Sequence, residues 1–233
     1  MHFEIGLENG IEGRSLAWVL DHPGCFAYGA APETAIAAVS AAILEYANWI
    51  ERHSQERWLE PGEIETQIVD TWQVYFIDED YRRVDFSSKS IESWFIHDWK
   101  PLTEEEVATS LHLLAWSRAD LLEIVRGLSR KMLEQEYTGE RWNIAGILKH
   151  VGGAEWWYQD RLGLAPPQEQ VPDKPFDRLD FIRFQLNETL PTLIGSHQVV
   201  GVGGEFWSPR KLLRRAVWHE RDHTAHIQAL LDS

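Results

Sequence analysis

The chain has 233 residues, of which 44% are hydrophobic, and its formal net charge is −15. This hydrophobic fraction is large enough to bury a core without disulfide bonds, and the lone cysteine, Cys25, excludes both an intramolecular disulfide and a thiolate cluster for metal. The chain has 37 acidic and 22 basic residues. The resulting negative surface charge repels phosphate backbones, so we expect no nucleic-acid partner.

From the N-terminal sequence we expect a cytoplasmic protein whose first element is a β-hairpin. Met1–Ile5 has no basic region, and no later apolar run is long enough to span a membrane, so we expect neither a signal peptide nor a membrane partner. Two strand-like runs follow, at His2–Glu8 and Arg14–Asp21. The Asn9-Gly10 pair between them predicts the turn of the hairpin.

A helix and a further strand complete the first part of the chain. His22-Pro23-Gly24 breaks the chain, and apolar residues then recur at helical spacing from Ala35 to Ile50. Residues 63–77 are rich in β-branched and aromatic residues, which predicts a strand. The order strand, strand, helix, strand predicts a small α+β domain over residues 1–100.

Part of this domain resembles a known family. The segment 22–29 (HPGCFAYG), followed by 32–35 (PETA), is similar to the small domain of HicB-like antitoxins. In that family a Pro-Gly-Cys turn and a short strand precede a helix that opens with Thr and acidic residues. The chain carries no recognisable DNA-binding tail. The resemblance implies a regulatory or ligand-holding role for residues 1–100.

Residues 101–233 show the pattern of an all-α four-helix bundle. After the Trp99-Lys100-Pro101 linker, Thr103 and Glu106 form a capping box, which predicts a helix start. Pro191 kinks or ends the third helix, and Ser208 is the predicted N-cap of the fourth. The predicted helices cover residues 104–129, 141–162, 177–194 and 209–231.

Histidines interrupt the apolar face of the fourth helix. His219, His223 and His226 occupy positions of a seam that otherwise holds Leu and Ala. His219 and His223 lie one turn apart on the same face, so both rings can approach one ion. His150 lies at a seam position of the second helix and is the best third ligand. His226 lies too far along the helix to reach the same ion, so we expect it to hydrogen-bond a polar partner instead.

This arrangement resembles the DinB-like superfamily of metal-binding four-helix bundles. In that superfamily one histidine of the second helix joins an H-x-x-x-H pair of the fourth. The matching segments are 148–157 (LKHVGGAEWW), 207–211 (WSPRK) and 214–223 (RRAVWHERDH). The resemblance implies that His150, His219 and His223 are the metal ligands. The chain departs from the pattern at His226, where many relatives have Gln.

Two other interpretations of the histidines stay open. Core histidines that are hydrogen-bonded to their neighbours would occupy the same positions. Residues 219–223 (HERDH) also match the H-E-x-x-H motif of zinc metalloproteases. Only 10 residues follow His223, which leaves no room for the third-ligand helix of those enzymes.

Three imidazole ligands would leave an open coordination position, which is typical of catalytic sites. Zinc is favoured, and nickel, iron and cobalt also suit imidazole. The sequence therefore predicts a metal-dependent enzyme of a hydrolase-like or thiol-S-transferase-like type, with Glu220 or Asp222 as base or ligand-orienting residue. The DinB-like resemblance implies a small-molecule substrate and a low-molecular-weight thiol. The alternative is a non-catalytic, metal-stapled module whose N-terminal domain binds a protein or small ligand; a homodimer is compatible with either.

Overall fold

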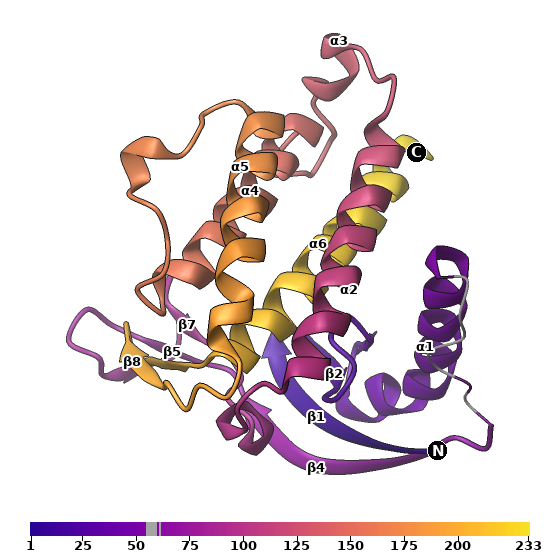
Figure 1. Cartoon of the computed structure of the whole chain (residues 1–233), viewed down its shortest axis with the longest axis vertical. Coiled ribbons are helices and arrows are strands. Elements are labelled where there is room, and N and C mark those ends of the chain that lie inside the picture. Colours follow the sequence, from indigo (N-terminus) through magenta and orange to yellow (C-terminus); the bar gives the residue numbers. More distant parts are fainter. Residues whose placement is uncertain (55–59, 61) are drawn as a thin grey trace. The chain divides into compact units, whose positions relative to one another are not determined.

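Helices and small β-sheets both contribute to the chain, and helices hold the larger share. The computed structural model describes residues 1–54, 60 and 62–233. Contacts group these residues into two compact units: residues 1–100 with 199–207, and residues 101–198 with 208–233 (Figure 1). Among the described residues, no helix has the length and apolar character needed to cross a membrane.

A mixed four-stranded sheet forms the centre of the first unit. Its strands are β1 (His2–Ile11), β2 (Arg14–Val19), β3 (Phe26–Gly29) and β4 (Glu65–Gln73), in the order β3-β2-β1-β4. β1 pairs antiparallel with β2 and parallel with β4, as the arrows in Figure 1 show.

The hairpin turn lies further along the chain than its sequence predicts. Glu12 (φ 48°) and Gly13 (φ 76°) form the two-residue connection, and Ile11 pairs with Arg14 across it. Two consecutive positive φ angles are typical of the type I′ turn. The predicted turn at Asn9-Gly10 is wrong: Gly10 also has a positive φ, 88°, but it lies where the register of β1 shifts. Its conformation is used for a bulge within the strand.

Helix α1 (Pro32–His53) covers this sheet and packs against β2 and β3. Its buried face includes Val39, Ile43 and Ile50. The helix approaches β3 closely at Gly29, where a Cβ atom would lie 2.1 Å from the backbone nitrogen of Ala35. Only glycine fits at this position.

Two small sheets complete the first unit, and one of them comes from a distant part of the sequence. The predicted strand at 63–77 divides in two, and the chain adds β5 (Tyr75–Ile77), β6 (Arg83–Val84), β7 (Ser90–Ile91) and the short 3-10 helix η1 (Ile96–Trp99). The hairpin of β8 (Val200–Val202) and β9 (Glu205–Trp207) also belongs to this unit. The Glu205 carboxylate accepts a hydrogen bond of 2.9 Å from the backbone N–H of Glu92.

Four long helices dominate the second unit. They are α2 (Glu104–Val125), α4 (Ile144–Asp160), α5 (Pro175–Thr189) and α6 (Pro209–Leu231). Shorter turns connect them: α3 (Arg130–Leu133), η2 (Gln168–Gln170) and η3 (Leu190–Leu193). α4 packs against both α5 and α6, and α2 packs against α6.

Local capping signals explain where these helices begin and end. The Thr103–Glu106 capping box is present, and the Ser208 hydroxyl accepts a hydrogen bond from the backbone N–H of Lys211, so both predicted starts are confirmed. The first helix ends at Val125, earlier than predicted, and Gly127 adopts a positive φ shortly after it. The second begins at Ile144, because Asn143 caps it.

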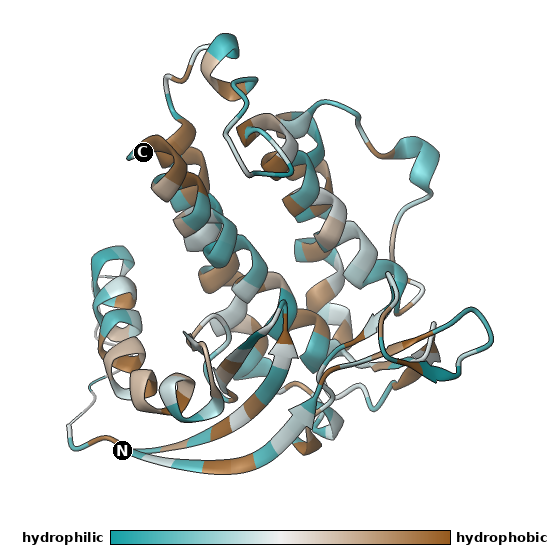
Figure 2. Ribbon diagram, turned by 180° about the vertical axis from the view of Figure 1, so that it is seen from behind, coloured by the Kyte–Doolittle hydropathy of each residue, from teal (hydrophilic) through white to brown (hydrophobic). Residues whose placement is uncertain are grey.

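An apolar core forms between the C-terminal ends of α2 and α6, the first half of α4 and the first half of α5. Ile227 and Leu230 of α6 are buried in this core, and the ribbon next to the C-terminus is coloured hydrophobic in Figure 2. They cluster with the end of α2 and the first half of α4. α4 approaches α5 closely at Gly152, where a Cβ atom would lie 2.9 Å from the Cγ of Arg178. The histidines described below lie along α4 and α6, beside this core.

We predict that a fragment of residues 101–233 folds better when its hairpin is removed. Without residues 1–100, the hairpin at 199–207 loses its own unit and exposes Trp207, which is fully buried in the whole chain. Replacing 199–207 by a flexible linker should therefore give a fragment with a cooperative thermal transition by circular dichroism and less aggregation. The two units would not be independent if neither fragment unfolded cooperatively.

Candidate functional site

Three histidines from two helices converge in the second unit. His150 comes from α4, and His219 and His223 lie one turn apart on α6. The Nε2 atom of His219 lies 3.1 Å from the Nε2 atoms of both His150 and His223. One nitrogen from each ring lies within 4.8 Å of the others. The residues predicted as ligands are therefore brought together.

Aromatic residues hold two of the three rings in place. Trp142 stacks on His150, with ring centroids 4.5 Å apart, and the guanidinium of Arg141 covers the Trp142 ring. Tyr158 meets the ring of His219 edge-on. His219 is buried, whereas His150 and His223 are only partly buried. The cluster is thus partly exposed at His150 and His223.

Burial keeps the imidazoles of His219 and His223 neutral. Desolvation lowers the pKa of His219 well below its usual value of 6.5, and the neighbouring His223, His150 and Arg215 lower it further. Desolvation, together with His150 and His226, lowers the pKa of His223 to about 3. At neutral pH both rings therefore carry a lone pair rather than a second proton, which is the state that binds a metal ion.

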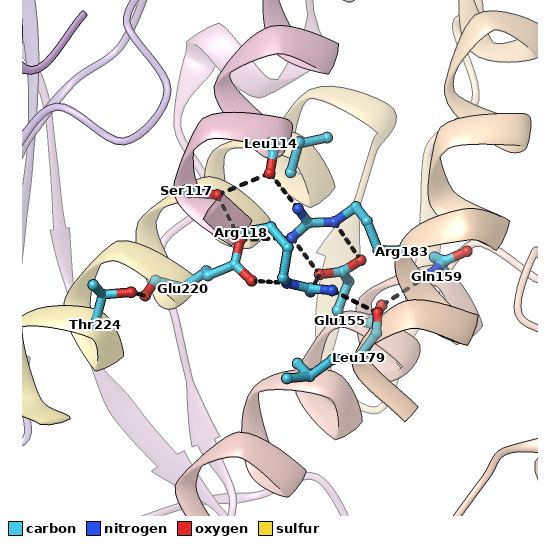
Figure 3. A network of polar contacts seen from close by, with 9 residues as sticks. All are labelled: Leu114, Ser117, Arg118, Glu155, Gln159, Leu179, Arg183, Glu220 and Thr224. Atoms are coloured by element: carbon cyan, nitrogen blue, oxygen red, sulfur yellow. Dashed lines mark hydrogen bonds and ion pairs between the residues drawn. The ribbon is translucent and has the colours of Figure 1, made fainter. Parts of the chain in front are cut away.

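A network of buried charges joins α2, α4, α5 and α6 (Figure 3). Arg183 donates from Nη2 to Glu155 (2.7 Å) and to Glu220 (2.8 Å). Arg118 donates from Nε to Glu220 at 2.5 Å and from Nη2 to Glu155 at 3.3 Å. Ser117 adds a hydroxyl hydrogen bond to Glu220. Two guanidiniums and two carboxylates thus neutralise each other where α2, α4, α5 and α6 meet.

This network changes the role expected of Glu220. Burial alone would raise the pKa of its carboxyl group, but Arg183 and Arg118 outweigh burial and lower that pKa. Both carboxylate oxygens accept charged hydrogen bonds, so Glu220 stays ionised and engaged in the network. It is not available as a catalytic base. Asp222 is half-buried and lies outside the group of converging ligand atoms.

His226 makes the kind of contact that its position predicts. Its Nε2 atom lies 3.0 Å from a carboxylate oxygen of Glu140, in the segment before α4, so the predicted hydrogen bond to a polar partner is confirmed. Each side chain of the pair is 34% exposed. The His226 side chain is therefore partly exposed to solvent and is not buried deep in the apolar seam of α6.

Several residues that contact the histidines or form the buried network were not predicted from the sequence. Trp142 and Glu140 belong to the segment before α4, and nothing in their spacing points to the histidines. Glu155 and Arg183 did carry a signal, since charged residues at interior-facing positions of amphipathic helices need buried partners. Which charges would pair cannot be read from a single sequence.

Comparison with known proteins adds no functional assignment. No protein-family model matches the chain, and neither the curated proteins nor the solved structures include a significant match. Any function must therefore be argued from the histidine cluster and the side chains around it.

We predict that protein stripped of bound ions loses stability as the pH falls below about 6.5. The unfolded chain binds protons on histidine near that pH, whereas the folded chain holds His219 and His223 neutral, so the unfolded state gains protons first. Between pH 7 and 5 each such histidine should remove about 1–2 kcal/mol from the free energy of unfolding.

Urea unfolding at several pH values measures this loss, and the matched control is His223→Asn. The variant lacks one of the titrating rings, so its stability should fall less steeply over the same pH range. Equal slopes in the two proteins would contradict the neutral state assigned to His223.

Proposed function

We propose that His150, His219 and His223 bind one divalent metal ion and that the protein is a metal-dependent enzyme. The spacing of the ligand nitrogens carries this proposal. Nitrogens held about 2.0–2.1 Å from a tetrahedral ion lie about 3.3 Å apart. The Nε2 atom of His219 lies 3.1 Å from those of His150 and His223, close to that value, and the three ligand nitrogens all lie within 4.8 Å of one another. Zinc is favoured, and nickel, iron and cobalt also accept imidazole.

The electrostatics of the cluster support the same proposal. The Nε2 atom of His219 faces two other ring nitrogens, yet a neutral ring can place at most one proton on that atom. Lone pairs that converge in a partly buried site repel each other, and a cation removes this repulsion. Protons compete poorly for the site because the pKa values of His219 and His223 are low.

The set of ligands supports a catalytic rather than a structural role. Among the described residues, no fourth histidine, cysteine or acidic side chain joins the group of three. His226 is engaged by Glu140. A fourth position would then remain for water or substrate, and an ion there would promote ionisation of a bound water or thiol.

The surroundings favour a small-molecule substrate. His150 and His223 are partly exposed, and the Trp142 ring stacks on His150. The similarity to DinB-like proteins favours thiol transfer over hydrolysis. Asp222, on the same helix as two of the ligands, remains the acidic residue proposed as base. The single cysteine suits a reducing compartment such as the cytoplasm.

We further propose that the two parts of the chain have the folds that their family resemblances imply. The packing of α2, α4, α5 and α6, with the three histidines on α4 and α6, supports a DinB-like four-helix bundle for residues 101–233. The short strand β3, followed by α1 beginning at Pro32, supports a HicB-like domain for residues 1–100. That domain would bind a ligand or regulatory partner.

We predict one equivalent of zinc or cobalt per chain in protein purified without a His-tag. His150→Ala, His219→Ala and His223→Ala should each lose tightly bound metal, because two imidazoles hold an ion weakly. His226→Gln is the matched control, since this histidine is on the same helix face but bonded to Glu140. Its metal content should equal that of the unaltered chain in elemental analysis.

Cobalt also reports whether the fourth position is open. Adding a low-molecular-weight thiol to the cobalt protein should produce a thiolate-to-cobalt absorption band, which a closed site would not show. A spectrum unaffected by thiols would favour the non-catalytic, metal-stapled alternative. Stoichiometric metal in the His219→Ala and His223→Ala variants would refute the ligand assignment itself.

A further inference from the structure

Each helix of the histidine cluster also carries one carboxylate of the buried network. On α6, Glu220 directly follows His219. On α4, Glu155 lies five residues after His150, which is about 7.5 Å along the axis at 1.5 Å per residue. The position of each histidine is therefore tied through a short length of rigid helix to a carboxylate that is almost fully buried.

The two arginines join these carboxylates across the helices. Arg183 donates to both Glu155 and Glu220 from Nη2. Arg118 also contacts both carboxylates, donating from Nε to Glu220 and from Nη2 to Glu155 (Figure 3). The arginines are also anchored reciprocally. Arg118 of α2 donates to the backbone carbonyl of Leu179 on α5 at 2.6 Å, and Arg183 of α5 donates to the carbonyl of Leu114 on α2.

The charges in this network determine how closely α4 and α6 can approach. Glu155 and Glu220 are both acidic and nearly inaccessible to water, so without the guanidiniums they would repel each other strongly. An ion held by the three histidines would span the same two helices, and metal–ligand distances tolerate changes of only about 0.2 Å. A small separation of the helices would withdraw His150 from His219 and His223.

We propose that Arg118 and Arg183 are positioning residues that hold His150 on α4 in register with His219 and His223 on α6. This inference rests on the proposed metal site. It assigns to the arginines a role in metal affinity and coordination geometry that is separable from their contribution to stability.

The test uses Arg118→Lys and Arg183→Lys in the full chain. Lysine keeps the positive charge but lacks the planar fork that bridges two carboxylates and a carbonyl. Each variant should bind cobalt at least about 10-fold more weakly, and its visible spectrum should shift towards that of His150→Ala. Combining Arg183→Lys with His150→Ala should weaken binding no further than His150→Ala alone. Additive losses would overturn the proposal.

Glu106→Gln provides the matched structural control. Glu106 pairs with Arg210 and so also joins α2 to α6, but Arg210 lies about 14 Å along the helix from His219. This variant should lower the melting temperature while its cobalt affinity and spectrum stay unchanged. If it weakened cobalt binding as much as the lysine variants, the arginines would have only a general structural role.

Ser117→Ala tests the positioning role if the lysine variants do not fold. It removes one hydroxyl hydrogen bond to Glu220 and leaves every charge in place, so the variant should fold and bind cobalt a few-fold more weakly. Unchanged affinity and spectrum would overturn the positioning role. If the unaltered chain failed to bind cobalt, the proposed metal site itself would fail, whereas metal binding with unaffected variants refutes only this inference.

Discussion

The second unit depends on one electrostatic constraint: four charged side chains must stay paired away from water. Moving an isolated ion out of water costs several kcal/mol, and removing one member of a buried pair costs about 3–5 kcal/mol. Arg118, Arg183, Glu155 and Glu220 come from four different helices, and their charges cancel. The helices therefore have to meet at one point with their side chains in one register, a condition that apolar packing alone does not impose.

The histidine cluster follows from this constraint. The carboxylates of the network lie on the same two helices as the histidines, so pairing the charges also brings the ring nitrogens together. Desolvation then keeps the rings of His219 and His223 neutral, and the stacking of Trp142 orients His150. Glu220 therefore lies directly beside a proposed ligand, yet its carboxylate is engaged by Arg118 and Arg183.

The features that were predictable from sequence are the ones that depend on local spacing. Helix starts at Thr103 and Ser208 are encoded by caps within four residues, and the convergence of His219 and His223 follows from one helical turn. Apart from the approach of His150 to His219, features that depend on distant partners were missed. The hairpin at 199–207 packs with residues far earlier in the chain, and Arg118 pairs with acids 37 and 102 residues away. The displaced hairpin turn shows that an Asn-Gly pair suits a bulge as well as a turn.

We propose that the network presents three imidazoles to one metal ion. X-ray absorption spectroscopy at the metal edge of the zinc-loaded full chain tests it most directly, because it reports the type, number and distance of the ligand atoms. We expect three imidazole nitrogens at about 2.0–2.1 Å and one further oxygen that a small thiol replaces with sulfur. A spectrum with one or two imidazoles, or one dominated by carboxylate oxygens, would contradict it.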